Sequence, residues 1–169
     1  QQWATPIEQF KHLCNNYDVH YEGFASPINS GLSSLQKTDG SIITKGNFCS
    51  LFEEDRVFGS IGRFFDNRLY GDSKRHWMIN PPFIEHIINK VSDKIIQDLE
   101  FAEMNNKKVM IVYILPSWVD MKGYQRVKQS RFLKHFEILE KIGKEIIFPY
   151  RNKLSPKSMS VKTESVCVI

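Results

Sequence analysis

Two neighbouring segments in the middle of the sequence constrain the fold most. Apolar residues recur at three- and four-residue steps between Ile84 and Met104, which predicts one long amphipathic helix. After a short polar turn, residues 109–115 (VMIVYIL) form an unbroken apolar run, typical of a parallel strand that is covered on both faces. A further strand is predicted at residues 75–79, so the three elements form a right-handed strand–helix–strand crossover. The sequence therefore predicts an α/β fold with a mostly parallel sheet.

The segments on either side of this unit have weaker patterns. Helical spacing of apolar residues predicts a covering helix at residues 6–16, and a short aromatic segment predicts the first strand at residues 19–24. No firm element is predicted at residues 33–50, although a second helix could form around residues 48–52. Residues 53–71 and 117–124 are predicted to be loops.

The C-terminal third is predicted to add antiparallel strands. Residues 136–139 or 146–148 could each form a strand, residues 165–169 resemble another, and a basic linker at residues 151–162 separates them. We therefore expect an antiparallel C-terminal hairpin on the mostly parallel sheet.

Size and composition indicate one globular domain. The chain has 169 residues, is 41% hydrophobic and carries a formal net charge of +4, which permits a nucleic-acid partner without requiring one. Cys14, Cys49 and Cys167 are far apart, so we expect reduced thiols, and the five histidines show no ligand spacing, so no metal is expected. No apolar run approaches the roughly 20 residues of a membrane span. The start at Gln1 indicates an intracellular piece of a longer polypeptide.

The tetrapeptide Asn80-Pro81-Pro82-Phe83 follows the predicted strand at residues 75–79 and points to methylation of a nucleobase amine. The lone pair of such an amine is delocalised into the ring, so a catalyst must hold both N–H bonds and turn the lone pair outward. The Asn80 side-chain oxygen and the Pro81 carbonyl could supply the two acceptors. The prolines stiffen the turn, and Phe83 offers a ring for stacking, worth about 1 to 3 kcal/mol per base. A rigid strand-to-helix turn is the structural alternative.

A methyl donor such as S-adenosylmethionine would need a backbone cradle and polar partners. Ligands of open α/β sheets bind outside the carboxyl ends of the strands, where strand order reverses, so residues 22–29 and 80–83 should open onto one crevice. Ser26, Asn29 and one of Asp55 or Asp66 could bind the donor. No general base is required, because the amine attacks as a neutral nucleophile and catalysis rests on positioning.

Four separated motifs together resemble the catalytic domain of the phosphorylated CTD-interacting factor family, the cap-specific adenosine methyltransferases. They are Glu22-Gly23-Phe24-Ala25-Ser26-Pro27-Ile28-Asn29, Asp55 followed by Phe58-Gly59-Ser60-x-Gly62, Asn80-Pro81-Pro82-Phe83-Ile84-Glu85, and Gln129-Ser130-Arg131-Phe132 with His135. Their order and approximate spacing agree with the family from about residue 17 to residue 169.

The resemblance implies a Rossmann-like methyltransferase that uses S-adenosylmethionine to methylate the 6-amino group of the cap-adjacent adenosine of mRNA. Asn80 to Phe83 would form the catalytic loop. Donor contacts would come from Glu22, Phe24, Ala25, Ser26, Pro27, Asn29 and Asp55, and substrate contacts from Phe58, Gly59, Ser60 and Gly62. Arg131 matches the Ser-Arg-Phe segment of the family, and we infer that it contacts a phosphate or the cap; an exposed helix or loop arginine is the alternative. The amino-terminal WW and helical modules of animal members are not visible in this sequence.

The resemblance also implies partners and a location. Capped mRNA would be the substrate, and regions outside this sequence could contact RNA polymerase II or a capping complex. The location would be intracellular: nuclear for a cellular protein, cytoplasmic or in the virion for a viral one. Two alternatives remain open, a DNA adenine methyltransferase and a non-catalytic methyltransferase-like domain that binds RNA or a partner.

Overall fold

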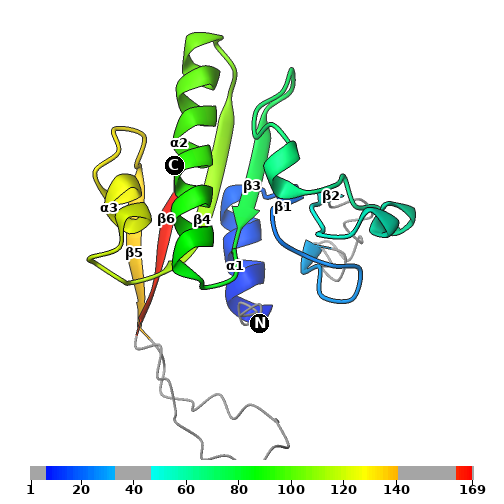
Figure 1. The fold of residues 1–169 in the computed structure, drawn as a ribbon, viewed down its shortest axis with the longest axis horizontal. Coiled ribbons are helices and arrows are strands. Elements are labelled where there is room, and N and C mark those ends of the chain that lie inside the picture. The colour runs from blue at the N-terminus through cyan, green and yellow to red at the C-terminus, as the bar shows by residue number, and fades with distance from the viewer. Residues whose placement is uncertain (1–6, 33–46, 141–162, 169) are drawn as a thin grey trace, which may run out of the picture.

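A computed structural model describes residues 7–32, 47–140 and 163–168, with side chains at residues 10–32 and 47–135. The described residues form an α/β structure (Figure 1). In chain order the elements are α1 (Ile7–Tyr17), β1 (Tyr21–Glu22), β2 (Asn47–Phe48), the 3-10 turns η2 (Glu53–Phe58) and η3 (Phe64–Asp66), β3 (Arg75–Ile79), α2 (Glu85–Met104), β4 (Val109–Pro116), α3 (Lys122–Lys128), β5 (His135–Glu140) and β6 (Thr163–Val168).

The strands form one sheet in the order β2-β1-β3-β4-β6-β5. The first four are parallel to one another, which confirms the predicted α/β fold with a parallel sheet and is compatible with a Rossmann-like fold. β6 pairs antiparallel with both β4 and β5. The segment between β5 and β6 lies outside the described residues, so a hairpin that joins them stays a prediction.

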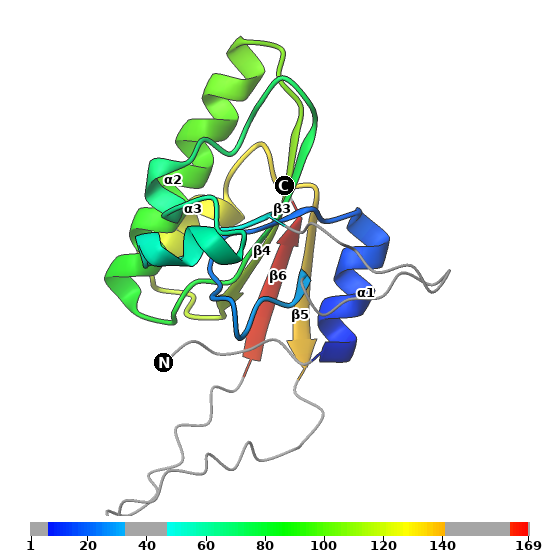
Figure 2. The same cartoon turned by 90° about the vertical axis from the view of Figure 1, so that its right-hand side faces the viewer.

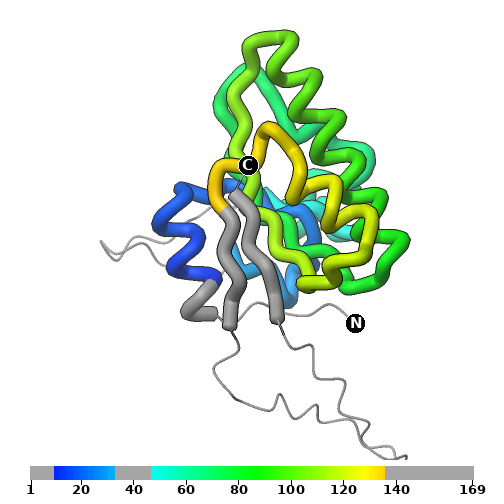
Figure 3. Tube along the Cα trace, turned by 90° about the vertical axis from the view of Figure 1, so that its left-hand side faces the viewer, coloured from blue at the N-terminus to red at the C-terminus, as the bar shows by residue number. Residues whose placement is uncertain are grey.

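Helices cover both faces of the sheet. Figure 2 shows α2 and α3 on one side and α1 on the other, and Figure 3 shows the same arrangement from the opposite edge. Alternate residues of β3 and β4 explain this layering, because successive side chains of a strand point to opposite faces. One set packs with α2 and α3 and the other with α1: Trp77, Ile79, Ile111, Tyr113 and Leu115 in the first, and Met78, Val112 and Ile114 in the second.

The central crossover forms where the apolar pattern predicted it. The buried residues of α2 recur at helical spacing from Ile88 to Ala102, and residues 111–115 of β4 are fully buried. Inside this core the hydroxyl groups of Ser92 and Tyr113 lie 3.1 Å apart and form a hydrogen bond. The bond satisfies polar groups that would otherwise be costly to bury.

Other predicted elements differ in extent. The first strand has only two residues, Tyr21 and Glu22, and the possible helix at residues 48–52 is wrong, because Asn47 and Phe48 form a strand beside β1. The predicted loop at residues 117–124 contains the start of α3. The possible strand at residues 146–148 lies outside the described residues.

Two further predictions concern cysteines and membranes. Cys14 and Cys49 are free and buried, as predicted, and burial raises the pKa of each thiol to about 12. The side chain of Cys167 lies outside the described residues. Among the residues that are described, no helix combines the length and apolar character needed to cross a membrane.

Candidate functional site at the β1 and β3 strand ends

The strand order places a topological switch point between β1 and β3. From β1 the chain forms β2 on one side and then β3 on the other, so both neighbours of β1 follow it in sequence. Because all three strands are parallel, their carboxyl ends lie at the same edge. Open α/β sheets bind ligands outside the carboxyl ends at such a point, and the predicted donor and catalytic loops both begin here.

Backbone hydrogen bonds connect the predicted donor loop to the ends of β3 and β2. The N–H of Gly23 donates a hydrogen bond to the carbonyl oxygen of Met78 at 2.8 Å, and the N–H of Ala25 donates to that of Cys49 at 2.9 Å. A Cβ atom at Gly23 would lie 3.0 Å from the Phe64 ring and 3.3 Å from Ile79. Glycine therefore lets the chain pass close to the end of β3.

Asn80 to Phe83 connect β3 to α2 at this edge. Asn80 directly follows β3, and its carboxamide oxygen is enclosed and accepts no hydrogen bond, although the residue makes other interactions. The Pro82 carbonyl oxygen accepts a hydrogen bond from the Ile84 N–H at 2.8 Å, so this carbonyl is used within the turn. Phe83 is partly buried against both core clusters. The tetrapeptide thus forms an anchored turn with Asn80 at the end of the strand.

Glu22 is a buried acid at the end of β1. The Ser30 hydroxyl donates a hydrogen bond to Glu22 Oε2 at 3.0 Å, and the backbone N–H of Leu32 donates to the same oxygen at 3.5 Å. Removal from water raises the pKa of this carboxyl to about 7, although the hydrogen bonds from Ser30, Leu32 and Gly31 act in the opposite direction. Glu22 therefore ties residues 30–32 to the sheet edge.

The other predicted donor contacts are partly engaged with each other. Both the backbone N–H and the hydroxyl of Ser26 donate to Asn29 Oδ1, at 2.7 and 2.9 Å. Asp55 accepts a hydrogen bond from the buried Ser50 hydroxyl. The Phe24 ring lies 4.7 Å from that of Phe64, and Ala25 is buried. These residues share the edge, but their polar groups form local turns.

The predicted substrate residues divide into two groups. Ser60 forms a parallel bridge with Phe48, so residues 58–62 lie beside the end of β2. Gly59 and Gly62 have positive φ angles of 98° and 96°, which favour glycine, and the Phe58 side chain is exposed.

Arg131 lies elsewhere. Its guanidinium Nη2 is 2.6 Å from a carboxylate oxygen of Glu103, near the far end of α2, and this contact raises the pKa of Arg131. Glu103 is 18 residues beyond Glu85, the first residue of α2, or about 27 Å along the helix at 1.5 Å per residue. The phosphate contact suggested for Arg131 stays a prediction, away from Asn80.

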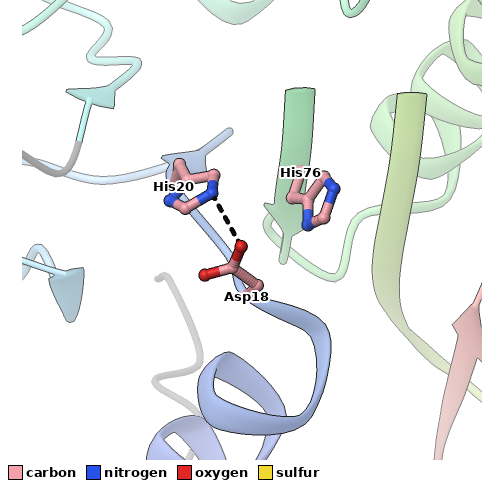
Figure 4. A group of neighbouring side chains, drawn as sticks. All are labelled: Asp18, His20 and His76. Carbon is pink, nitrogen blue, oxygen red and sulfur yellow. Dashed lines mark ion pairs between the residues drawn. The ribbon is translucent and has the colours of Figure 1, made fainter. Parts of the chain in front are cut away.

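One group of side chains was missed by the sequence analysis. Asp18, His20 and His76 each place a possible metal-ligand atom within 4.8 Å of the others (Figure 4). His20 and His76 are 56 positions apart, and only the pairing of β1 with β3 brings them together. No spacing in the sequence could reveal this group.

Comparison with known protein families shows to which family the chain belongs. Residues 1–147 match the family described as "Phosphorylated CTD interacting factor 1 WW domain". The chain belongs to the phosphorylated CTD interacting factor 1 family. The description names a WW domain, a module that we expected to be missing from this sequence. The matched residues, 1–147, include every helix and strand that the structure describes from α1 to β5.

Two curated relatives agree with this membership. The chain is 27% identical over 142 residues to proteins named "mRNA (2'-O-methyladenosine-N(6)-)-methyltransferase" from Homo sapiens and Mus musculus. The aligned region covers 82% of this chain and 17% of each relative. The chain thus spans about a sixth of the length of these relatives.

Proposed function

We propose that this chain forms the core of an S-adenosylmethionine-dependent methyltransferase that modifies the 6-amino group of adenosine, with the cap-adjacent (2'-O-methyl)adenosine of mRNA as substrate. The observation that carries the proposal is the position of Asn80-Pro81-Pro82-Phe83 at the end of β3, beside the end of β1 at the switch point. The activity for which the two relatives are named supports the choice of adenosine in mRNA.

In this proposal Asn80 binds and orients the amine. Its carboxamide oxygen and the Pro81 carbonyl oxygen would accept the two N–H bonds of the adenine amine, and Phe83 would offer the exposed part of its ring to the base. Pro81 is buried and the turn is hydrogen-bonded to the start of α2. The turn would therefore hold the backbone of both residues in place before the substrate arrives, which lowers the entropic cost of the reaction. The enclosed Asn80 oxygen would reach the amine by rotation of its side chain.

The donor would lie at the end of β1. When bound there, S-adenosylmethionine would supply an electrophilic methyl group. Glu22 and residues 24–29 are at the required edge, but Ser26 bonds Asn29 and Asp55 bonds Ser50. If the donor bound through these side chains, it would have to replace their local hydrogen bonds. The backbone of residues 24–29 could bind the donor without breaking those bonds.

The local hydrogen bonds of Ser26 and Asp55 favour a second candidate, a methyltransferase-like domain that binds RNA or a partner without a methyl donor. Titration of the chain with S-adenosylhomocysteine in a calorimeter separates the two. Heat with saturation supports the enzyme, and absence of heat at millimolar ligand supports the non-catalytic domain. Glu22→Gln, which keeps the side-chain size, should weaken saturation if Glu22 contacts the donor.

Substrate choice needs a separate experiment. The natural protein that contains this sequence should be incubated with labelled S-adenosylmethionine and, in parallel, capped RNA, uncapped RNA of the same sequence and duplex DNA. We expect transfer to capped RNA above both others. Preference for duplex DNA would overturn the RNA substrate and support a DNA adenine methyltransferase.

Partners and location are part of the proposal. Contact with RNA polymerase II or a capping complex would use regions outside this sequence. The protein would be intracellular, in the nucleus if cellular and in the cytoplasm or virion if viral.

A further inference from the structure

The edge of the sheet opposite Asn80 holds three potential metal ligands. His76 is the second residue of β3 and Asn80 follows the strand, so the two positions are about 13 Å apart at roughly 3.3 Å per residue. We propose that Asp18, His20 and His76 bind a divalent transition-metal cation of the Zn²⁺ class, at a site separate from the methyl-transfer site. This proposal does not rest on the proposed function.

The backbone fixes the relative positions of the three residues. The N–H of His20 donates to the carbonyl oxygen of His76 at 3.0 Å, and the two rings have centroids 5.5 Å apart. Asp18 follows the last residue of α1 and has a φ angle of 50°, in the left-handed region. Aspartate adopts this region more readily than most residues. The tight turn directs the chain from α1 back to β1, so the carboxylate lies beside His20 (Figure 4).

His76 is held in a way that suits a ligand. It is buried, and its Nδ1 lies 2.7 Å from the carbonyl oxygen of Tyr17. Because a carbonyl oxygen only accepts, Nδ1 is the donor in this contact, and Nε2 is the ring nitrogen left to bind a cation. Histidine ligands of metals almost always donate their second ring N–H to a carboxylate, backbone carbonyl or water. The Tyr17 carbonyl oxygen already accepts this hydrogen bond from His76.

The distances allow a cation after small side-chain movements. Zinc bonds of about 2.0 to 2.2 Å to nitrogen and oxygen place tetrahedral ligand atoms about 3.4 Å apart. The Asp18 Oδ2 and His20 Nε2 atoms are already 3.2 Å apart, and the side chains of His20 and Asp18 are 48% and 77% exposed. They can rotate to close the separations of up to 4.8 Å in the group. Two imidazoles and one carboxylate suit zinc and leave the fourth position for water.

Binding would join α1 to β1 and β3. A cation that binds only the folded chain stabilises it in proportion to the logarithm of its concentration. Thermal stability therefore provides a readout that is independent of methyl transfer.

The test is calorimetric titration of the untagged chain with Zn²⁺, with thermal unfolding at matched concentrations. Asp18→Asn removes the charge while keeping a residue that tolerates positive φ, and His20→Ala changes an exposed side chain. His86→Ala, at an exposed histidine on α2, is the matched control. We expect one Zn²⁺ per chain, affinity lowered at least about tenfold in the first two variants, and an unchanged affinity in the control.

Three results would overturn the site. They are no Zn²⁺ binding at millimolar concentration, equal binding by the wild type and both ligand variants, and an intense thiolate charge-transfer band when Co²⁺ replaces Zn²⁺. The last result would place the metal on cysteine. Far-ultraviolet circular dichroism verifies that each variant is folded, and His20→Ala alone decides the outcome if Asp18→Asn does not fold.

Discussion

The hydroxyl group of Ser30 donates a hydrogen bond to the buried carboxylate of Glu22 across 3.0 Å. This contact connects the loop after β1 back to the strand, at the edge where the proposed donor would bind. It also buries a titratable group next to the site. The state of that group should therefore influence both the stability of the fold and the conformation of residues 30–32.

Glu22 should make stability fall as pH rises. Burial raises its pKa from 4.5 to about 7, so the folded chain binds a proton between these values that the unfolded chain has released. Stability from this group is fully present below about pH 4.5 and is lost as pH rises through 7. Denaturant unfolding from pH 4 to 8 should show the wild type losing about 3 kcal/mol relative to Glu22→Gln. Parallel pH profiles for the two proteins would show that folding does not raise the pKa of Glu22.

Gly123 should be intolerant of even a methyl group. A Cβ atom there would lie 2.8 Å from Asn89 Oδ1, 2.9 Å from Ser92 Oγ and 3.0 Å from the Asn89 Cα atom of α2. We expect Gly123→Ala to force α3 away from α2 and to lower the free energy of unfolding by about 1 to 3 kcal/mol. Urea unfolding measures this, with the exposed Lys122→Ala as control. Equal stability of the two variants would mean that α3 packs less closely than described.

Substitution of Arg131 should show whether this residue contacts RNA or only stabilises the fold. Its partner Glu103 is exposed, and exposed ion pairs add little to stability, so Arg131→Ala should unfold at the wild-type denaturant concentration. If Arg131 contacts a phosphate, the variant should bind RNA more weakly at every sequence, with a salt dependence reduced by about 0.7 in log–log slope. Fluorescence anisotropy at several salt concentrations measures this. Arg126→Ala, in a similar exposed pair with Asp93, is the matched control, and identical curves would remove Arg131 from the RNA-binding surface.

The strongly patterned elements were predictable from the sequence. α2 has seven buried residues at helical spacing, and β3 and β4 are almost entirely buried, so burial and local pattern agree. α3 has seven residues, of which Gly123, Tyr124 and Val127 are buried, too few to show a period. β1 and β2 have two residues each, and they exist through pairing rather than local preference.

The candidate site was predictable only in part. Asn80 follows β3 and residues 23–29 follow β1, and parallel pairing brings the ends of these strands to one edge, as predicted. The local hydrogen bonds of Ser26 and Asp55 depend on loop conformation, which residue type does not determine. The position of Arg131 depends on the length and direction of α2, and the group of Asp18, His20 and His76 depends on strand register. These relations are set by tertiary structure.

Quantifying N6-methyladenosine by mass spectrometry tests the central role of Asn80 most directly. Capped RNA should be incubated with S-adenosylmethionine and the natural protein that contains this sequence, as wild type, as Asn80→Ala and as Asn16→Ala, a control at an exposed asparagine on α1. We predict product from the wild type and the control, and at least a hundredfold less from Asn80→Ala with an unchanged circular dichroism spectrum, because loss of a preorganised hydrogen-bonding group costs about that factor. Wild-type levels of product from folded Asn80→Ala would contradict the account.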